Sequence, residues 1–178
     1  MSAGPVIDTP RLTLRRHRLD DYEACCFLTS DPEAVRMIFQ SPLSREDTWH
    51  RLLRFAGHWA LLGYGLFVVE EKATGRVVGE VGLADFHREL GDDFDVYPEM
   101  AWMMASDVHG RGYATEAAQG VLRWAESQNA PERTVCIIDP HNGASLRVAE
   151  KLGYHPFGRD TYKGRPVLKL RRFGPTQH

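Results

Sequence analysis

Cysteine is scarce in this 178-residue chain, which contains only Cys25, Cys26 and Cys136. Two of the three are adjacent, and no Cys-x-x-Cys spacing occurs. This pattern argues against a disulfide framework and against a zinc site. We therefore expect reduced thiols, no metal ion and a cytoplasmic location.

Long apolar runs and a strong net charge are also missing. The longest apolar stretch, residues 59–69, is broken by Gly63 and Gly65, whereas a membrane-spanning helix needs about 20 residues. The amino-terminal segment has neither the basic region nor the apolar region of a secretory signal. A formal net charge of −2 gives no general attraction to nucleic acid or to an anionic membrane. We expect neither as a partner.

Apolar residues are abundant enough for one folded domain. The hydrophobic fraction of 43% and the charged fraction of 26% are ordinary for a globular protein. At this length we expect a single domain over residues 1–178, with its core at about 9–173. Four arginines near the amino terminus are partly balanced by acidic residues and are expected to lie on a solvated strand edge: Arg11, Arg15, Arg16 and Arg18.

Hydrophobic periodicity and turn residues predict an α/β (α+β) fold. Strands are expected at 11–15, 66–70, 76–83, 99–105, 134–138, 154–158 and 165–171, and helices at 19–29, 32–38, 44–62, 113–128 and 143–152. Asp31, Ser44 and Asn142 occupy N-cap positions. Residues 66–83 form a hairpin pattern that turns at Thr74-Gly75. Residues 90–97 are acidic and contain glycine, so we expect an exposed connection.

The most informative stretch is His109-Gly-Arg-Gly-Tyr-Ala114, where an apolar strand enters a glycine loop and a helix begins. Glycine lets the backbone approach a ligand closely, and the first N–H groups of a helix have no internal partner. The helix dipole adds positive charge there, and Glu116 is expected to stabilise that helix end. We predict that this loop binds a phosphate-bearing cofactor. It is not a P-loop, because no Gly-Lys-[Ser/Thr] follows.

A second motif lies downstream, Asn142-Gly-Ala-Ser145 followed by Leu152-Gly153-Tyr154. In this order the two motifs resemble the GNAT superfamily of acetyl-CoA-dependent N-acetyltransferases. The stretches at 112–117 and 9–15 are similar to the branch that includes the ribosomal-protein N-terminal acetyltransferases. The resemblance implies a central mixed, mostly antiparallel, twisted sheet of about six to seven strands flanked by helices, in the order β-α-α-β-β-β-α-β-α-β-β.

The resemblance implies acetyl-CoA as co-substrate and suggests which residues bind it. Loop N–H groups would hold the pyrophosphate, although the first loop position has histidine where glutamine or arginine is commoner. The strands at 99–105 and 134–138 would splay, which frees main-chain groups for the pantetheine arm. The expected cofactor-binding residues are Trp102, Met103, Met104, His109, Gly110, Arg111, Gly112, Tyr113, Ala114, Thr115 and Asn142.

Direct transfer of acetyl to an amine, as the resemblance implies, needs a base for the ammonium and an acid for the leaving thiolate. It needs no nucleophile, so the cysteines are expected in the core. Glu99 is the expected base, acting through water, with Asp95 and His87 as substitutes; an interior glutamate paired with arginine is an equal alternative. Ala149 stands where many relatives have tyrosine, which leaves Ser145 or water as the acid. Ser145 is otherwise an ordinary helix-surface serine.

The acceptor is expected to be a small-molecule amine or a protein N-terminus. It would bind between the helices of residues 19–62 and the Lys163-Gly164 turn. Four acidic residues would suit a cationic amine or would merely form a solvated loop: Glu89, Asp92, Asp93 and Asp95. The leading hypothesis is an N-acetyltransferase, monomer or homodimer. The alternatives are an inactive or weakly active acyl-CoA-binding module and an enzyme of another type that uses a nucleotide cofactor.

Overall fold

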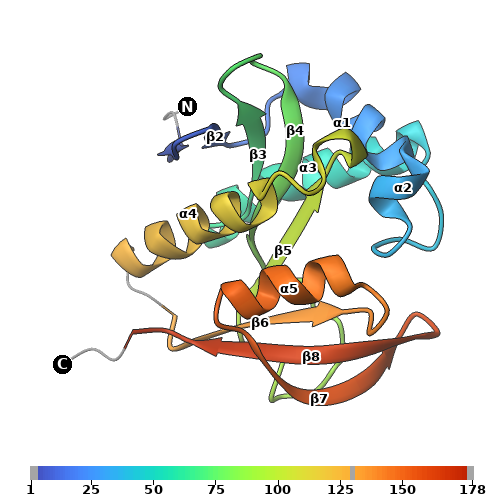
Figure 1. Cartoon of the computed structure of the whole chain (residues 1–178), viewed down its shortest axis with the longest axis vertical. Coiled ribbons are helices and arrows are strands. Elements are labelled where there is room, and N and C mark those ends of the chain that lie inside the picture. The colour runs from blue at the N-terminus through green and yellow to red at the C-terminus, as the bar shows by residue number, and fades with distance from the viewer. Residues whose placement is uncertain (1–3, 129–130, 176–178) are drawn as a thin grey trace.

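The computed structural model describes residues 4–128 and 131–175. Its strands are β1 (Ile7–Asp8), β2 (Leu12–Arg15), β3 (Leu66–Glu71), β4 (Val77–Ala84), β5 (Glu99–Met104), β6 (Arg133–Ile138), β7 (His155–Tyr162) and β8 (Arg165–Phe173). Its helices are α1 (Tyr22–Ser30), α2 (Pro32–Val35), α3 (Arg45–Leu62), α4 (Tyr113–Ser127) and α5 (Gly143–Lys151), with 3-10 turns η1 (Leu19–Asp21) and η2 (Ser106–Val108). Helices flank one twisted sheet (Figure 1).

The strands form one eight-stranded sheet in the order β1-β2-β3-β4-β5-β6-β8-β7. Among the described residues every neighbouring pair is antiparallel except β5 and β6. The expected mixed, mostly antiparallel sheet is therefore confirmed. The additional strand is β1, whose two residues are too few to show a strand pattern in the sequence.

The sheet divides between β5 and β6, which share a single register pair, Glu99 with Val135. By contrast, β4 pairs with β5 at six positions and β6 pairs with β8 at six positions. The implied splay is confirmed. Helix α4 lies along the half that contains β1 to β5, and α5 lies over the half that contains β6 to β8 (Figure 1).

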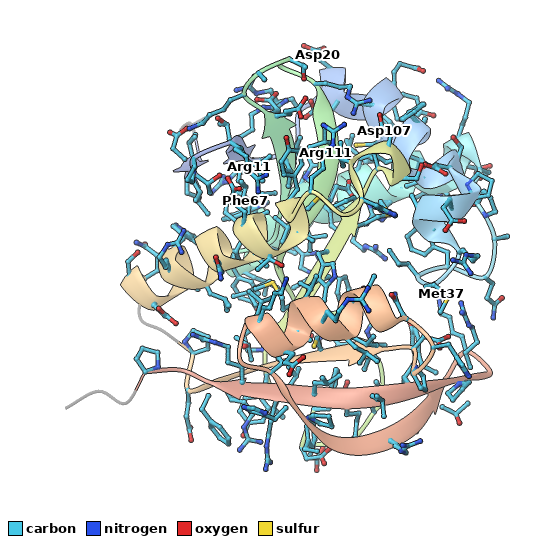
Figure 2. All side chains as sticks on the ribbon, viewed as in Figure 1. Arg11, Asp20, Met37, Phe67, Asp107 and Arg111 are labelled. Atoms are coloured by element: carbon cyan, nitrogen blue, oxygen red, sulfur yellow. The ribbon has the colours of Figure 1, made fainter. Side chains whose placement is uncertain are left out.

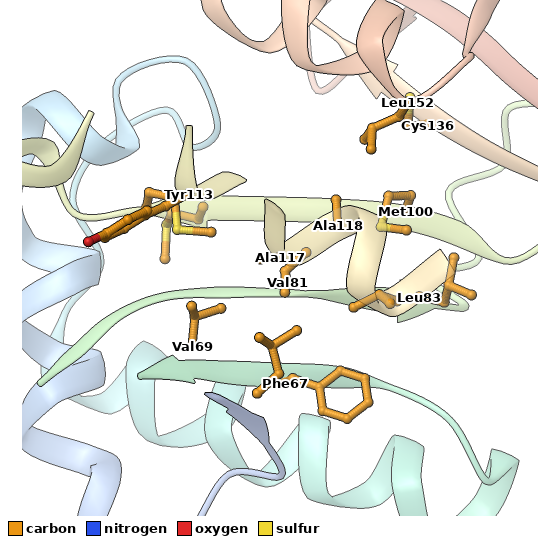
Figure 3. Packing of buried hydrophobic residues seen from close by; sticks show 14 of the residues in the cluster. Phe67, Val69, Val81, Leu83, Met100, Tyr113, Ala117, Ala118, Cys136 and Leu152 are labelled. Carbon is orange, nitrogen blue, oxygen red and sulfur yellow. The ribbon is translucent and has the colours of Figure 1, made fainter. Parts of the chain in front are cut away.

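Apolar packing joins α4 and α3 to the first half of the sheet. Val69 and Val81 of neighbouring strands face the cluster that includes Ala117 of α4 (Figure 3). Phe67 is fully buried, with its ring centroid 4.9 Å from that of Trp59 in α3 and 5.4 Å from that of Trp124 in α4. Because edge-to-face rings add to the burial energy, this trio ties three elements together.

The predicted helix starts are confirmed at two caps. The side chain of Ser44 accepts the N–H of Asp47, and Asp31 accepts the N–H groups of Glu33 and Ala34. The second helix ends at Val35 rather than at residue 38. The first helical segment opens as the 3-10 turn η1, in which the N–H of Asp21 donates to the carbonyl of Arg18 (3.1 Å), and the Asp21 carboxylate caps this turn by accepting the N–H of Arg18 (2.6 Å).

The expectation of a solvated arginine edge is wrong for Arg15, which is 8% exposed. Its guanidinium donates to both carboxylate oxygens of Asp21, at 2.7 and 2.8 Å, and to Glu70 of β3. Burial raises the pKa of Asp21, but the bonds from Arg15 outweigh it and the pKa is lowered. Arg11, by contrast, is exposed.

The segment at residues 90–97 is not simply an exposed connection. Leu90 and Phe94, four residues apart, are buried against Val135. Lys169 of β8 donates to the carbonyl of Leu90 and pairs with Asp93 at 3.0 Å. The prediction of an exposed connection relied on the acidic composition of this segment and overlooked its two buried apolar residues.

All three cysteines are free and buried, as expected for core residues. Burial raises the pKa of the Cys136 thiol well above its ordinary value, so this group is a poor nucleophile. Within residues 4–128 and 131–175, no helix combines the length and apolar character needed to cross a bilayer.

Replacing Phe67 with alanine should lower the free energy of unfolding by roughly 3–5 kcal/mol, because a fully buried ring leaves a cavity between two tryptophans. Urea unfolding followed by tryptophan fluorescence measures this change. Leu61→Ala, at a side chain that is 86% exposed, is the control and should stay within about 0.5 kcal/mol. Equal costs for the two variants would contradict the packing described.

Candidate functional site

The glycine loop runs from η2 into α4 in a conformation that requires glycine twice. Gly110 has φ 78° and Gly112 has φ 79°, both left-handed. The turn is closed by hydrogen bonds from the N–H of His109 to Ser106 and from the N–H of Arg111 to Val108. This backbone path brings the loop over the start of α4.

Five main-chain N–H groups of this segment find no acceptor among the described residues: those of Gly110, Gly112, Tyr113, Ala114 and Thr115. Three of them belong to the first turn of α4, where no internal partner exists. Together with the helix dipole they form an anion-binding cradle. The predicted phosphate loop therefore has the required backbone geometry.

Arg11 lies beside the cradle although it is far away in the sequence (Figure 2). Its guanidinium donates to the carbonyl of Arg111 at 2.8 Å and pairs with Glu116 at 2.7 Å. Glu116 also accepts the hydroxyl of Thr9 and the N–H of Arg11. Glu116 thus anchors the amino-terminal segment to α4, beyond its expected effect on the helix dipole.

The side chains of two predicted loop residues point away from an anion. Tyr113 is buried, and its hydroxyl donates to Glu71 at 2.6 Å. A ring nitrogen of His109 lies 3.0 Å from the carbonyl oxygen of Met104. Of these two residues only Tyr113 has a backbone N–H available to an anion, because the N–H of His109 donates to Ser106 in the turn.

The gap between β5 and β6 exposes main-chain groups of β5. The N–H of Ala105 donates to the carbonyl of Val78, so the main-chain groups of Ala105 point toward β4. Because main-chain groups alternate in direction along a strand, those of Met103 face β4 and those of Trp102 and Met104 face the gap. The gap can thus pair with an extended amide-bearing chain.

A cavity of about 140 Å³ lies where the two strands diverge. Four of the predicted site residues line it: Glu99, Trp102, Asn142 and Ser145. The Asn142 side chain accepts the N–H of Ser145, which confirms it as the N-cap of α5. The indole of Trp102 donates to the Ser145 hydroxyl oxygen at 3.2 Å.

Glu99 is 4% exposed and forms a two-pronged ion pair with Arg88, at 2.6 and 2.8 Å. Burial raises the pKa of Glu99, and Arg88 only partly opposes that shift. Glu99 is therefore an interior glutamate paired with arginine and also a wall of the cavity.

A second cavity, of about 400 Å³, adjoins the first and shares Arg88, Trp102 and Tyr162 with it. It lies at the place expected for the acceptor, between residues 38–55 and the Lys163 turn. Gln40 donates to the carbonyl of Lys163 at 2.9 Å, and this bond joins the two walls.

Sequence reasoning missed the charged group at the base of this second cavity. Glu80 of β4 is 1% exposed and is paired with Arg51 and with His17, the latter at 2.9 Å. Burial would raise the pKa of Glu80, but these two partners lower it to about 2. The sequence does contain a sign of this buried charge, because Glu80 is the one charged residue in the apolar stretch 77–84.

The predicted acidic residues do not line either cavity. Asp93 pairs with Lys169, and Asp95 accepts the N–H of Gly91 at 2.9 Å. Glu89 and Asp92 are exposed in the same connection. His87, the other substitute base, is 84% exposed and pairs with Asp85. The reason is that this connection folds back onto β6 and β7 through Leu90 and Phe94.

The family model described as "Acetyltransferase (GNAT) domain" matches residues 11–155. The uncharacterized protein YkkB of Bacillus subtilis (strain 168) is 37% identical over 95 residues, and the match spans about half of each protein, 52% of this chain and 53% of YkkB. The uncharacterized N-acetyltransferase p20 of Bacillus licheniformis is 25% identical over 163 residues, which cover 90% of this chain and 89% of p20.

Solved structures agree with the family match. A structure from Bordetella pertussis, assigned to the GnaT family of acetyltransferases, has a TM-score of 0.84 and 29% identity, covering 94% of this chain and 98% of its own. RimL, a ribosomal L7/L12 alpha-N-protein acetyltransferase in complex with coenzyme A, has a TM-score of 0.78 and covers 95% of this chain and 98% of its own. At 15% identity, RimL shows a likeness of fold.

Gly112→Asp should weaken CoA binding by roughly tenfold or more, because the carboxylate would repel a phosphate and strain the left-handed backbone. Isothermal titration with CoA measures the affinity. Gly75→Asp is the control, since Gly75 also has a left-handed φ of 69° and nothing within 4 Å of an added Cβ. An unchanged affinity for CoA in Gly112→Asp would show that the glycine loop does not bind CoA.

Proposed function

The chain belongs to the GNAT acetyltransferase family, and we propose that it transfers the acetyl group of acetyl-CoA directly to the primary amine of a small molecule or a peptide N-terminus. One observation carries the proposal. The anion cradle at α4 leads through the gap between β5 and β6 to the cavity of Glu99 and Ser145, and that cavity opens onto a second one. Donor and acceptor could thus meet from opposite sides.

The residues fit the charges and the amides of CoA. The cradle of N–H groups, with Arg11 and Arg111 beside it, suits a pyrophosphate. Main-chain groups of Trp102 and Met104 would pair with the pantetheine amides, and the amide N–H groups of Asn142 remain available for the same arm. Acetyl-CoA supplies the activated thioester when it is bound.

Glu99 is the residue that we assign as the proton acceptor. A primary amine attacks the thioester carbonyl only after it loses a proton. A raised pKa brings a carboxylate closer to the range in which a general base is effective. Because Arg88 occupies both carboxylate oxygens, a water molecule is the natural relay between Glu99 and the ammonium.

Ser145 is the hydroxyl assigned to the leaving thiolate. The indole N–H of Trp102 fills an acceptor site on the Ser145 oxygen, so the hydroxyl proton is free to point into the cavity. A serine is a weak acid, and its part is to donate a hydrogen bond to the sulfur while water supplies the proton. Ala149 is fully buried, so no hydroxyl reaches the sulfur from that position.

The weakness of the Ser145 hydroxyl as an acid supports a second candidate, an acyl-CoA-binding module with little or no transferase activity. Release of free CoA thiol distinguishes the two. We expect acceptor-dependent thiol release when the protein is given acetyl-CoA and a panel of amines and peptides, read with a thiol reagent. CoA binding without thiol release from any acceptor would favour the binding module, and no CoA binding would refute both.

Glu99→Gln should lower kcat by about a hundredfold, within the 10²–10⁴ range typical of general-base catalysis, and should leave CoA affinity unchanged. In the wild type kcat should rise with pH as Glu99 loses its proton, whereas the variant should lack this limb. The pH profile of kcat and the thermal unfolding temperature should be measured together. A variant that folds and keeps the wild-type pH limb would exclude Glu99 as the base.

A further inference from the structure

The two joined cavities carry an excess of positive charge. Five cationic side chains line them: Arg51, Arg54, Arg88, Lys163 and Arg165. The three carboxylates that line them are Glu80, Glu99 and Asp139, and each is already paired, with Arg51, Arg88 and Arg165 respectively. Within residues 4–128 and 131–175, Arg54 and Lys163 are the two lining cations with no carboxylate within 4.0 Å.

Arg54 is held in place by aromatic rings rather than by an anion. Its guanidinium lies 5.3 Å from the centroid of Phe55 and 5.7 Å from that of Phe86. Arg51 lies over the first of these rings at 4.4 Å, and Arg88 lies over the second at 4.5 Å. Three guanidinium groups therefore share two rings, and only the central one lacks an ionic partner.

This crowding is electrostatically unfavourable for Arg54. Arg54 is an exposed residue of α3, but partial desolvation of its guanidinium and the charges of Arg51 and Arg88 lower its pKa. An anion placed at this point of the cavity would relieve the repulsion and would meet a planar guanidinium that can donate two parallel hydrogen bonds. Lys163, at the rim of the same cavity, adds a second positive charge.

We propose that the acceptor is an amine that also carries a carboxylate, and that Arg54 binds this carboxylate while the amine points toward Glu99. The inference rests on the proposed function and specifies its substrate class. It replaces the cationic amine expected from the acidic residues at 89–95, because those residues lie outside both cavities. A polyamine would meet two unneutralised cations and no free carboxylate among the described lining residues.

The positive surroundings also have a chemical consequence. Like charges disfavour the ammonium form, so the cavity lowers the pKa of a bound amine and favours the neutral nucleophile. A zwitterionic acceptor gains an ion pair at Arg54 that offsets this repulsion, and Lys163 remains as the unpaired positive charge. A purely cationic acceptor would be repelled before it could benefit.

The test compares matched acceptors that differ only in charge. Free L-amino acids are compared with their carboxamides, and tripeptides that begin with aspartate are compared with tripeptides that begin with asparagine. The first pair probes a free α-carboxylate, and the second probes an acidic peptide N-terminus. In the wild type we expect kcat/KM to favour the carboxylate member of one pair by roughly tenfold to a hundredfold.

Arg54→Gln should abolish this preference by raising KM for the acid, Arg54→Lys should restore part of it, and all variants should unfold at the wild-type temperature. Arg123→Gln is the matched control, because Arg123 is an exposed arginine of α4 outside both cavities. Acetyl transfer that favours the amides or a polyamine, or a carboxylate preference that Arg54→Gln retains, would overturn the inference and leave the proposed function standing. No thiol release with any amine would overturn the proposed function and the inference together.

Discussion

Parallel neighbouring strands normally share hydrogen bonds along their length, yet β5 and β6 meet only at Glu99 and Val135. Beyond this pair each strand keeps its antiparallel partner, β4 on one side and β8 on the other. Each half of the sheet is therefore satisfied separately, and the gap leaves unpaired groups on only the two facing edges. Buried main-chain groups without partners are costly, so such a gap favours occupation by a ligand with amides of its own.

The same divergence determines what surrounds the gap. Trp102 lies on β5 and Ser145 on α5, so their hydrogen bond spans the two halves at the cavity. At the far end, Asp31 accepts the hydroxyl of Ser106, which ties the start of α2 to the turn before the glycine loop. The bond between Trp102 and Ser145 thus connects the two halves of the sheet where strand pairing does not. A site that depends on precise separation is thus supported by polar contacts rather than by continuous pairing.

Several local features of the fold and the site could be predicted from the sequence. The glycine loop, the caps at Ser44 and Asn142 and the hairpin at Thr74-Gly75 depend on residues adjacent in sequence, so their patterns were sufficient. Arg11 and Arg54 could not be found in that way. Arg11 reaches the loop across the β1–β2 edge, and Arg54 matters only because Phe86 and Arg88 come from a different part of the chain. Composition failed for a related reason at residues 90–97, where two apolar side chains outweighed the acidic ones.

The charge pattern of the cavities follows from the same long-range assembly. Ion pairs deep in a protein must recover the cost of desolvation, and the pairs at Glu80 and Glu99 do so by using every carboxylate oxygen they present. Each pair therefore neutralises one arginine, and neither carboxylate balances the charge of Arg54. Arg54 arrives on the next turn of α3 after Arg51, so it faces the same cavity without a partner of its own. Arg54 is thus unbalanced because helix periodicity places it in the cavity and because the carboxylates that line the cavities pair with other arginines. An incoming ligand is therefore its natural counter-ion.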